Sequence, residues 1–277
     1  MKKIIQYIKY LLNQERFNEI LSRRTIVFLH IYKVGGSSFW LSLAKEMANN
    51  VEIDFAISDS YHESLNLANS NLEGIHNRTL LYIQERFFFS NKKRHVIHHH
   101  NNQGFLDPIL GSSGFIVMTR KPEDRLRSAF RHVMKSSVNQ IIDPVENRVV
   151  TYDFTHNPVE FFGKPLSSGL NHYFANLFNY QIDPLAPPPP YVIDFIKKNF
   201  YFFTLDDFRS NNHKIKLIEK KFSISSIDCI HYEGTITDSK FDKDLDFLLA
   251  NNKDFSRKWN EFLNAEILWH KALGLDV

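Results

Sequence analysis

The chain has 277 residues, 43% of them hydrophobic and 23% charged, which is the balance of a globular protein with a sizeable core. Its formal net charge of +3 is too small to indicate nucleic-acid binding, although a mild positive charge suits an anionic ligand. The single cysteine, Cys229, excludes an intrachain disulfide and indicates a reducing compartment, so we expect a cytoplasmic protein.

Residues 1–24 form the first distinct segment, with basic residues around a short apolar stretch. Lys9 interrupts this stretch and no small-residue cleavage site follows, which argues against a signal peptide. No span reaches the roughly 18 to 20 apolar residues of a transmembrane helix. The segment therefore predicts an amphipathic helix packed on a single domain that covers residues 1–277. Peripheral contact with a membrane, or with a partner protein, is the alternative role of this helix.

Short apolar runs alternate with helical patterns along the rest of the chain. This alternation predicts an α/β fold with a mainly parallel central sheet flanked by helices, in which ligands bind beyond the carboxyl ends of the strands. Residues 136–170 are polar and predict irregular chain, and the prolines of 183–190 predict an extended loop. The expected strands are 25–30, 51–57, 94–100, 114–120 and 201–205. The expected helices are 37–49, 72–89, 121–135, 166–178, 191–200, 209–222 and 253–275.

A glycine turn, in the stretch HIYKVGGSSF of residues 30–39, joins the first strand to the next helix. Gly35 and Gly36 allow the backbone to approach a ligand, and the amides of Ser37 and Ser38 at the helix start suit anionic oxygens. Lys33 adds a full positive charge. The turn predicts a phosphate or sulfate site, with a tight turn that uses its glycines for packing as the alternative. The lysine precedes the glycines, so the magnesium-binding Ser or Thr of a Walker nucleotide site is missing.

A second anion site is predicted in the stretch TRKPEDRLRSAF, residues 119–130. Arg120 ends a strand and Ser128 lies on the following helix, so both can converge on one oxyanion, which a guanidinium grips with two hydrogen bonds. Arg125 shares a helix face with Ser128 and is expected to be structural or to support this site. A surface helix whose acidic residues pair with the arginines is the alternative. Two separate anion sites fit 3′-phosphoadenosine 5′-phosphosulfate (PAPS), which carries a 5′-phosphosulfate and a 3′-phosphate.

The histidine run of residues 98–100 ends a predicted strand. Strand alternation places His98 and His100 on one face and His99 on the other. Transfer to a hydroxyl requires a base, and histidine, with an intrinsic pKa of about 6.5, suits that role. Purely structural histidines are an alternative. A metal site is disfavoured, because neighbouring strand residues cannot all face one ion and no companion cysteine or H-E-x-x-H pattern is present.

The motifs also resemble a known family. HIYKVGGSSF is similar to the HIPKTGGTSF-type phosphosulfate loop of the carbohydrate sulfotransferases that include heparan sulfate 2-O-sulfotransferase. TRKPEDRLRSAF is similar to the family's R-x-P-x-x-R-x-x-S motif for the 3′-phosphate. Weaker similarity continues in LSSGLNHYFANLF, YFFTLDDF and FLNAEILWHKAL, so the resemblance runs from about residue 25 to residue 274. Tyr32 and Val34 depart from the proline and threonine of the family loop, but Val34 keeps its amide.

The resemblance implies a P-loop-like sulfotransferase fold and sulfuryl transfer from PAPS, without a metal, to a hydroxyl acceptor, most simply a glycan. It places the 5′-phosphosulfate on residues 33–38 and the 3′-phosphate on Arg120 and Ser128. It assigns the general base to His100, four residues before Gly104, with His98 as the alternative, and Lys33 to stabilising the leaving group. An ATP-dependent kinase of P-loop type and a non-catalytic anion-binding module are the competing functions.

Overall fold

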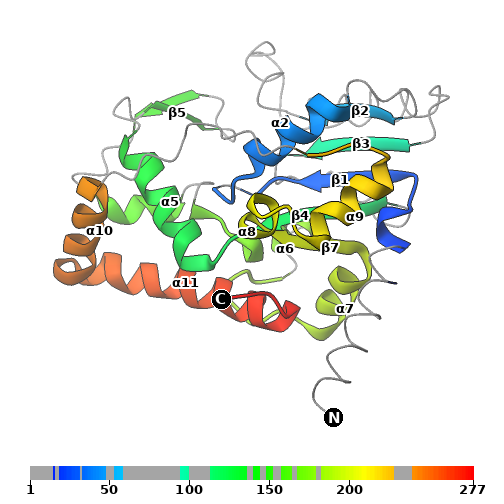
Figure 1. Ribbon diagram of the computed structural model, residues 1–277. Helices are drawn as coiled ribbons and strands as arrows, with labels where there is room; N and C mark the ends of the chain where they lie inside the picture. The colour runs from blue at the N-terminus through cyan, green and yellow to red at the C-terminus, as the bar shows by residue number, and fades with distance from the viewer. Residues whose placement is uncertain are drawn as a thin grey trace.

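The structure is a computed structural model of the chain, and it describes residues 15, 19–31, 33–47, 53–58, 94–99, 113–135, 140–143, 148–151, 157–163, 167–178, 182–227 and 239–277. Its centre is a parallel sheet with the strand order β2-β3-β1-β4-β7, flanked by helices (Figure 1). The α/β class and the parallel sheet are therefore as predicted. The strands are β1 Thr25–Leu29, β2 Ile53–Ser58, β3 Arg94–His99, β4 Ser113–Thr119 and β7 Phe200–Thr204.

The described helices fall between and after these strands, as a βαβ chain requires. They are α2 Gly36–Met47, α5 Pro122–Lys135, α6 Leu170–Leu177, α7 Pro190–Asn199, α8 Leu205–Arg209, α9 His213–Phe222, α10 Ser239–Asn251 and α11 Lys253–Leu273, with a 3-10 turn η1 at Pro158–Gly163. No helix in the described part of the chain is long and apolar enough to cross a membrane.

Alternating side chains of the sheet pack against different helices on its two faces. On one face, Phe28 of β1 and Phe203 of β7 both contact Phe39 of α2, at ring-centroid distances of 5.0 and 4.7 Å. On the other face, Phe200 of β7 contacts Phe174 of α6 at 5.1 Å. Such aromatic pairs add stabilisation beyond the area they bury. The sheet is thus the middle of three layers, and its many phenylalanines form the core.

A second apolar cluster lies beside the sheet and contains buried residues of α5, η1, α10 and α11: Leu126, Ala129, Phe130, Val133, Phe161, Phe162, Leu245, Phe255 and Trp259. The long helix α11 links the two cores, because its later residues Trp269 and Leu273 belong to the cluster around the sheet. In Figure 1, α11 runs beneath the molecule from α10 towards α7. This arrangement fixes α5, and the residues it carries, relative to the sheet.

The observed elements differ from the sequence-based prediction in three places. The stretch predicted to be irregular contains a two-stranded antiparallel hairpin, β5 Gln140–Asp143 and β6 Arg148–Thr151, as well as η1. The helix predicted over 209–222 begins only at His213, where Asn212 caps α9, and the short helix α8 that precedes it was not predicted. Helix α10 was not predicted. The helix predicted over 72–89, and most of the N-terminal helix of 1–24, lie outside the described residues, although Ile20 and Leu21 are buried in the core.

Candidate functional site

The strand order creates one position in the sheet where connections leave in opposite directions. From β1 the chain passes through α2 to β2 on one side, and from the adjacent β4 it reaches β7 on the other side. In open α/β sheets, the ligand crevice lies beyond the carboxyl ends of the strands at such a switch point. The glycine turn follows β1 and Arg120 follows β4. Both predicted anion sites therefore lie where this rule expects a ligand.

The glycine turn has the backbone that an anion cradle needs. Lys33 has φ 64° and Gly35 has φ 93°, both left-handed, so the chain turns sharply before α2. Lys33 adopts this left-handed conformation although it is not a glycine, so its backbone is locally strained. Strain of this kind is common at functional sites. The amides of Gly36, Ser37 and Ser38 lie in the first turn of α2, at the positive end of the helix dipole. The first turn of α2 carries no acidic residue, so no carboxylate of that turn competes with a bound anion.

The two glycines are required by close packing as well. A Cβ at Gly36 would lie 2.2 Å from Cδ2 of His30, and one at Gly35 would lie 2.7 Å from Cδ1 of Leu205. Leu205 begins α8, directly after β7, and β4 lies between β1 and β7 in the sheet. The turn thus reaches from the end of β1 to the start of α8. Val34 is buried in the core, which explains an apolar residue inside the loop.

Arg120 lies level with Leu205, because the preceding Thr119 pairs with Thr204. Its side chain is half-buried, and burial is the main cause that lowers the pKa of its guanidinium. The positive charges of Arg131 and Arg209 lower this pKa further, while the carboxylates of Asp124 and Asp206 raise it. A bound anion would offset the cost of holding this charge away from water.

Ion pairs divide the arginines of this region into two groups. Each arginine of α5 has a carboxylate partner: Arg125 pairs with Glu266, Arg127 with Glu123 and Asp246, and Arg131 with Asp242. Within the described residues, Arg120 forms no ion pair. The alternative prediction, that acidic residues of the helix itself occupy the arginines, therefore holds only for Arg127, which pairs with Glu123. The partners of Arg125 and Arg131 come from α11 and α10.

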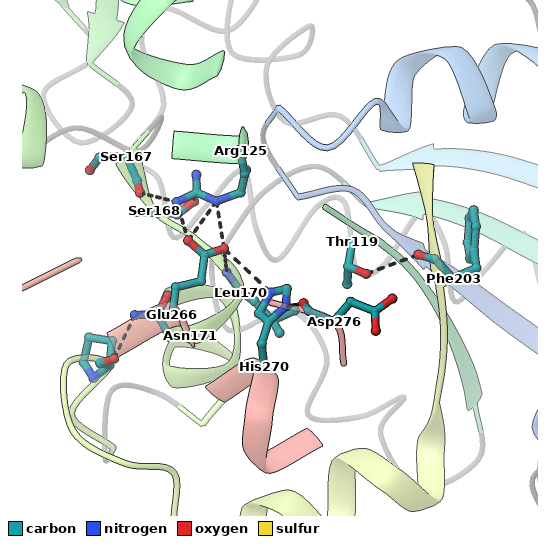
Figure 2. Close-up of polar contacts among 11 residues, drawn as sticks. Thr119, Arg125, Ser167, Ser168, Leu170, Asn171, Phe203, Glu266, His270 and Asp276 are labelled. Atoms are coloured by element: carbon teal, nitrogen blue, oxygen red, sulfur yellow. Dashed lines mark hydrogen bonds and ion pairs between the residues drawn. The ribbon is translucent and has the colours of Figure 1, made fainter. Parts of the chain in front are cut away.

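The guanidinium of Arg125 is held entirely by partners within the protein. Its Nε donates to Oε1 of Glu266 at 2.8 Å and its Nη2 donates to Oε2 at 2.7 Å, a bidentate pair (Figure 2). The guanidinium also donates to the carbonyl oxygens of Ser167 and Ser168, at 3.0 and 3.3 Å. Arg125 and Glu266 are both almost fully buried. Ser128 lies one turn further along α5 and is half-buried.

Of the histidine run, the structure describes the backbone of two members. Strand β3 pairs with β1 so that His98 lies opposite Phe28 and His99 opposite Leu29, the last residue of β1. The end of β3 is therefore at the same sheet edge as the glycine turn. His100 lies outside the described residues, and so do the side chains of His98, His99 and Ser37. Their predicted roles stay predictions. Among the described residues, no group of three or more His, Cys, Asp or Glu side chains is arranged to hold a metal.

Three residues around the site have contacts that the sequence did not predict. His30 is buried under the glycine turn and stacks on Phe28 at 5.8 Å. Tyr173 of α6 donates its hydroxyl to the carbonyl oxygen of His30 at 3.0 Å. Glu266 interrupts the apolar face of α11 between Trp259 and Trp269, and a carboxylate in such a position is the signal that could have revealed a buried partner.

Comparisons of the chain with protein-family models, with characterised proteins and with solved structures gave no match. What the chain does must therefore be argued from the site itself.

Proposed function

We propose that the chain is a PAPS-dependent sulfotransferase with a P-loop-like fold, which transfers a sulfuryl group to an acceptor hydroxyl, most simply of a glycan. The observation that carries the proposal is the pair of anion sites at the ends of adjacent strands. One is the lysine-bearing glycine turn before α2, and the other is Arg120, which has no ion pair among the described residues. A ligand with an anionic group at each end suits this arrangement, and the resemblance of both motifs to sulfotransferases agrees with it.

In the proposed mechanism PAPS supplies the sulfuryl group, and the protein binds and orients PAPS and neutralises its negative charge. Arg120 and Ser128 hold the 3′-phosphate. The amides of Gly36 to Ser38 and the Lys33 ammonium hold the 5′-phosphosulfate. His100 accepts the proton of the acceptor hydroxyl as the new oxygen–sulfur bond forms and the bond from sulfur to the 5′-phosphate oxygen breaks. Lys33 stabilises the negative charge that develops on that departing oxygen.

The direct test of the two-anion site is binding of adenosine 3′,5′-bisphosphate, measured by calorimetry and by thermal shift. Arg120→Ala and Ser128→Ala should each weaken binding by about tenfold or more, because a hydrogen bond to a charged group contributes about 1.5 to 3 kcal/mol. Adenosine 5′-phosphosulfate lacks the 3′-phosphate, and its affinity should hardly change. Asp246→Asn serves as the matched control, because it removes an exposed carboxylate from Arg127 on the same helix. Equal losses for both ligands would contradict the 3′-phosphate assignment.

Turnover is tested by transfer of labelled sulfate from PAPS to hydroxyl acceptors. Lys33→Ala should lower the rate by orders of magnitude and weaken bisphosphate binding less, since the charge that Lys33 neutralises develops during transfer. Lys45→Ala, at the exposed opposite end of α2, is the control. Stabilisation by ATP with Mg²⁺ in place of the bisphosphate would indicate a kinase, and bisphosphate binding without transfer to any acceptor would indicate a binding module.

A further inference from the structure

The buried pair of Arg125 and Glu266 has more partners than an ion pair needs. Besides the bidentate contact, the guanidinium donates to two carbonyl oxygens, of Ser167 and Ser168, immediately before α6. The carboxylate accepts from the amide of Leu170, the first residue of α6, at 3.3 Å. One side chain of α11 therefore joins α5 to the start of α6 (Figure 2). Arg125, Glu266, Ser167 and Leu170 are all buried, and only Ser168 is partly exposed.

The chain around Glu266 is shaped to admit its carboxylate. A Cβ at Gly169 would lie 2.3 Å from the carboxyl carbon of Glu266 and 2.4 Å from Oε2, so any side chain there would displace it. His270, one turn along α11, places Nε2 at 4.0 Å from Oε1, and its Nδ1 lies 2.9 Å from the carbonyl oxygen of Asp276. The carboxylate is thus fixed by contacts on several sides.

This connection reaches both anion sites of the proposed function. Arg125 lies on α5 between Arg120, at the end of β4, and Ser128, one turn further on. Helix α6, which the carboxylate holds at its first residue, carries Tyr173, whose hydroxyl holds the carbonyl oxygen of His30 at the start of the glycine turn. A change in the tilt of α5 would move Ser128 relative to Arg120, because α5 leaves the sheet just after Arg120.

We propose that Glu266 is a positioning residue, which holds α5 through Arg125 so that Ser128 lies beside Arg120 and both can grip one anion. This inference rests on the proposed function, because it concerns the residues that would bind the 3′-phosphate. A buried ion pair is a poor means of stabilising a fold, since apolar residues of the same volume often do as well. Its fixed bidentate geometry is better suited to holding two elements in one relative position.

A double-mutant cycle with adenosine 3′,5′-bisphosphate as the probe tests this role, with Kd measured well below the unfolding temperature of each variant. Glu266→Gln should weaken binding by about tenfold or more, as if one contact to the 3′-phosphate were lost. Ser128→Ala should cost about tenfold in the unmodified protein but less than about threefold in Glu266→Gln, because Ser128 is then already displaced. The affinity for adenosine 5′-phosphosulfate should stay unchanged. Asp246→Asn, which removes the exposed α10 partner of Arg127 on α5, should alter none of these values.

A second variant keeps the test decisive if Glu266→Gln does not fold. Replacing Arg125 and Glu266 together by methionine removes both buried charges at similar volume and is expected to preserve the fold. In this double variant, Ser128→Ala should have little further effect on bisphosphate affinity. Arg125→Lys keeps the charge without the planar guanidinium, so its bisphosphate affinity should fall by an intermediate amount. If Ser128→Ala weakens bisphosphate binding by the same factor with and without the changes at Arg125 and Glu266, the positioning role is overturned. The proposed function would then still stand. Failure of the unmodified protein to bind the bisphosphate would overturn both.

Discussion

His172 of α6 provides a stability test that does not depend on the proposed function. Its side chain is partly buried and stacks on Phe262 with a centroid distance of 5.1 Å. Nδ1 is buried and has no hydrogen-bond partner. Burial lowers the pKa of this imidazole from 6.5 to about 4, and repulsion from Arg125 lowers it further, while the carboxylates of Glu266 and Asp183 oppose the shift. The folded protein therefore keeps His172 neutral over a range in which the unfolded chain is protonated.

The sign and size of the effect follow from linkage. Between pH 6.5 and pH 4 the unfolded state binds one more proton at this residue, so the free energy of unfolding falls as the pH falls. With pKa values of 6.5 and about 4, the loss is about 2 kcal/mol from pH 7 to pH 5 and about 3 kcal/mol by pH 4. Burial also lowers the pKa of His270, which adds a loss in the same direction.

The measurement is urea unfolding of the unmodified protein and of His172→Phe at pH 7, 6 and 5. Phenylalanine keeps the ring stacked on Phe262 and removes the titrating group, so the variant should lose about 2 kcal/mol less between pH 7 and pH 5. Because both proteins share every other titrating group, the difference between their pH dependences isolates His172. Identical pH dependence in the two proteins would refute the reasoning and show that the imidazole is solvated or paired in the folded state.

Three further predictions concern the buried pair, the glycine turn and the base. Glu266→Gln should lower the free energy of unfolding by about 3 to 5 kcal/mol, because it leaves a guanidinium buried without its counter-charge; a loss below about 1 kcal/mol in urea unfolding would contradict this. Gly36→Ala should cost about 1 to 3 kcal/mol, since the new methyl group would meet a buried imidazole at 2.2 Å, and it should weaken bisphosphate binding as the turn shifts. His100→Ala should slow sulfate transfer by about 10² to 10⁴ with bisphosphate affinity unchanged, and the acid limb of the pH–rate profile should disappear. If His98→Ala is the inactive variant instead, the base is His98.

The parts of the fold that the sequence predicted are those with strong local patterns. Strands β1, β4 and β7 are short apolar runs that are buried on both faces, and α5 begins with a proline and two acidic residues that suit a helix start. The glycine turn and Arg120 could be placed at one sheet edge for the same reason, because parallel strands all end there. These predictions need only neighbouring residues and the period of the pattern.

The parts that the sequence did not predict are of two kinds: helix starts whose local capping residues were overlooked, and contacts between distant segments. Helix α8 has only five residues and owes its start to a capping box between Thr204 and Asp207, with hydrogen bonds of 3.0 and 2.7 Å. Asn212 starts α9 in a similar way, and both caps were present in the sequence as recognisable residue types. The partnership of Arg125 with Glu266 spans 141 residues, and no local pattern relates the two.

The distribution of carboxylates explains why Arg120, rather than the arginines of α5, suits a ligand. Arg125 is neutralised by a buried partner, and Arg127 and Arg131 by carboxylates nearer the surface, so the charges of α5 are satisfied within the protein. Arg120 is half-buried, stands among further positive charges, and forms no ion pair among the described residues. Partial burial of a charge without a partner is unfavourable, and an anion bound beside it would remove that cost. The same argument does not extend to the arginines of α5, for which an added anion would have to displace a carboxylate already in place.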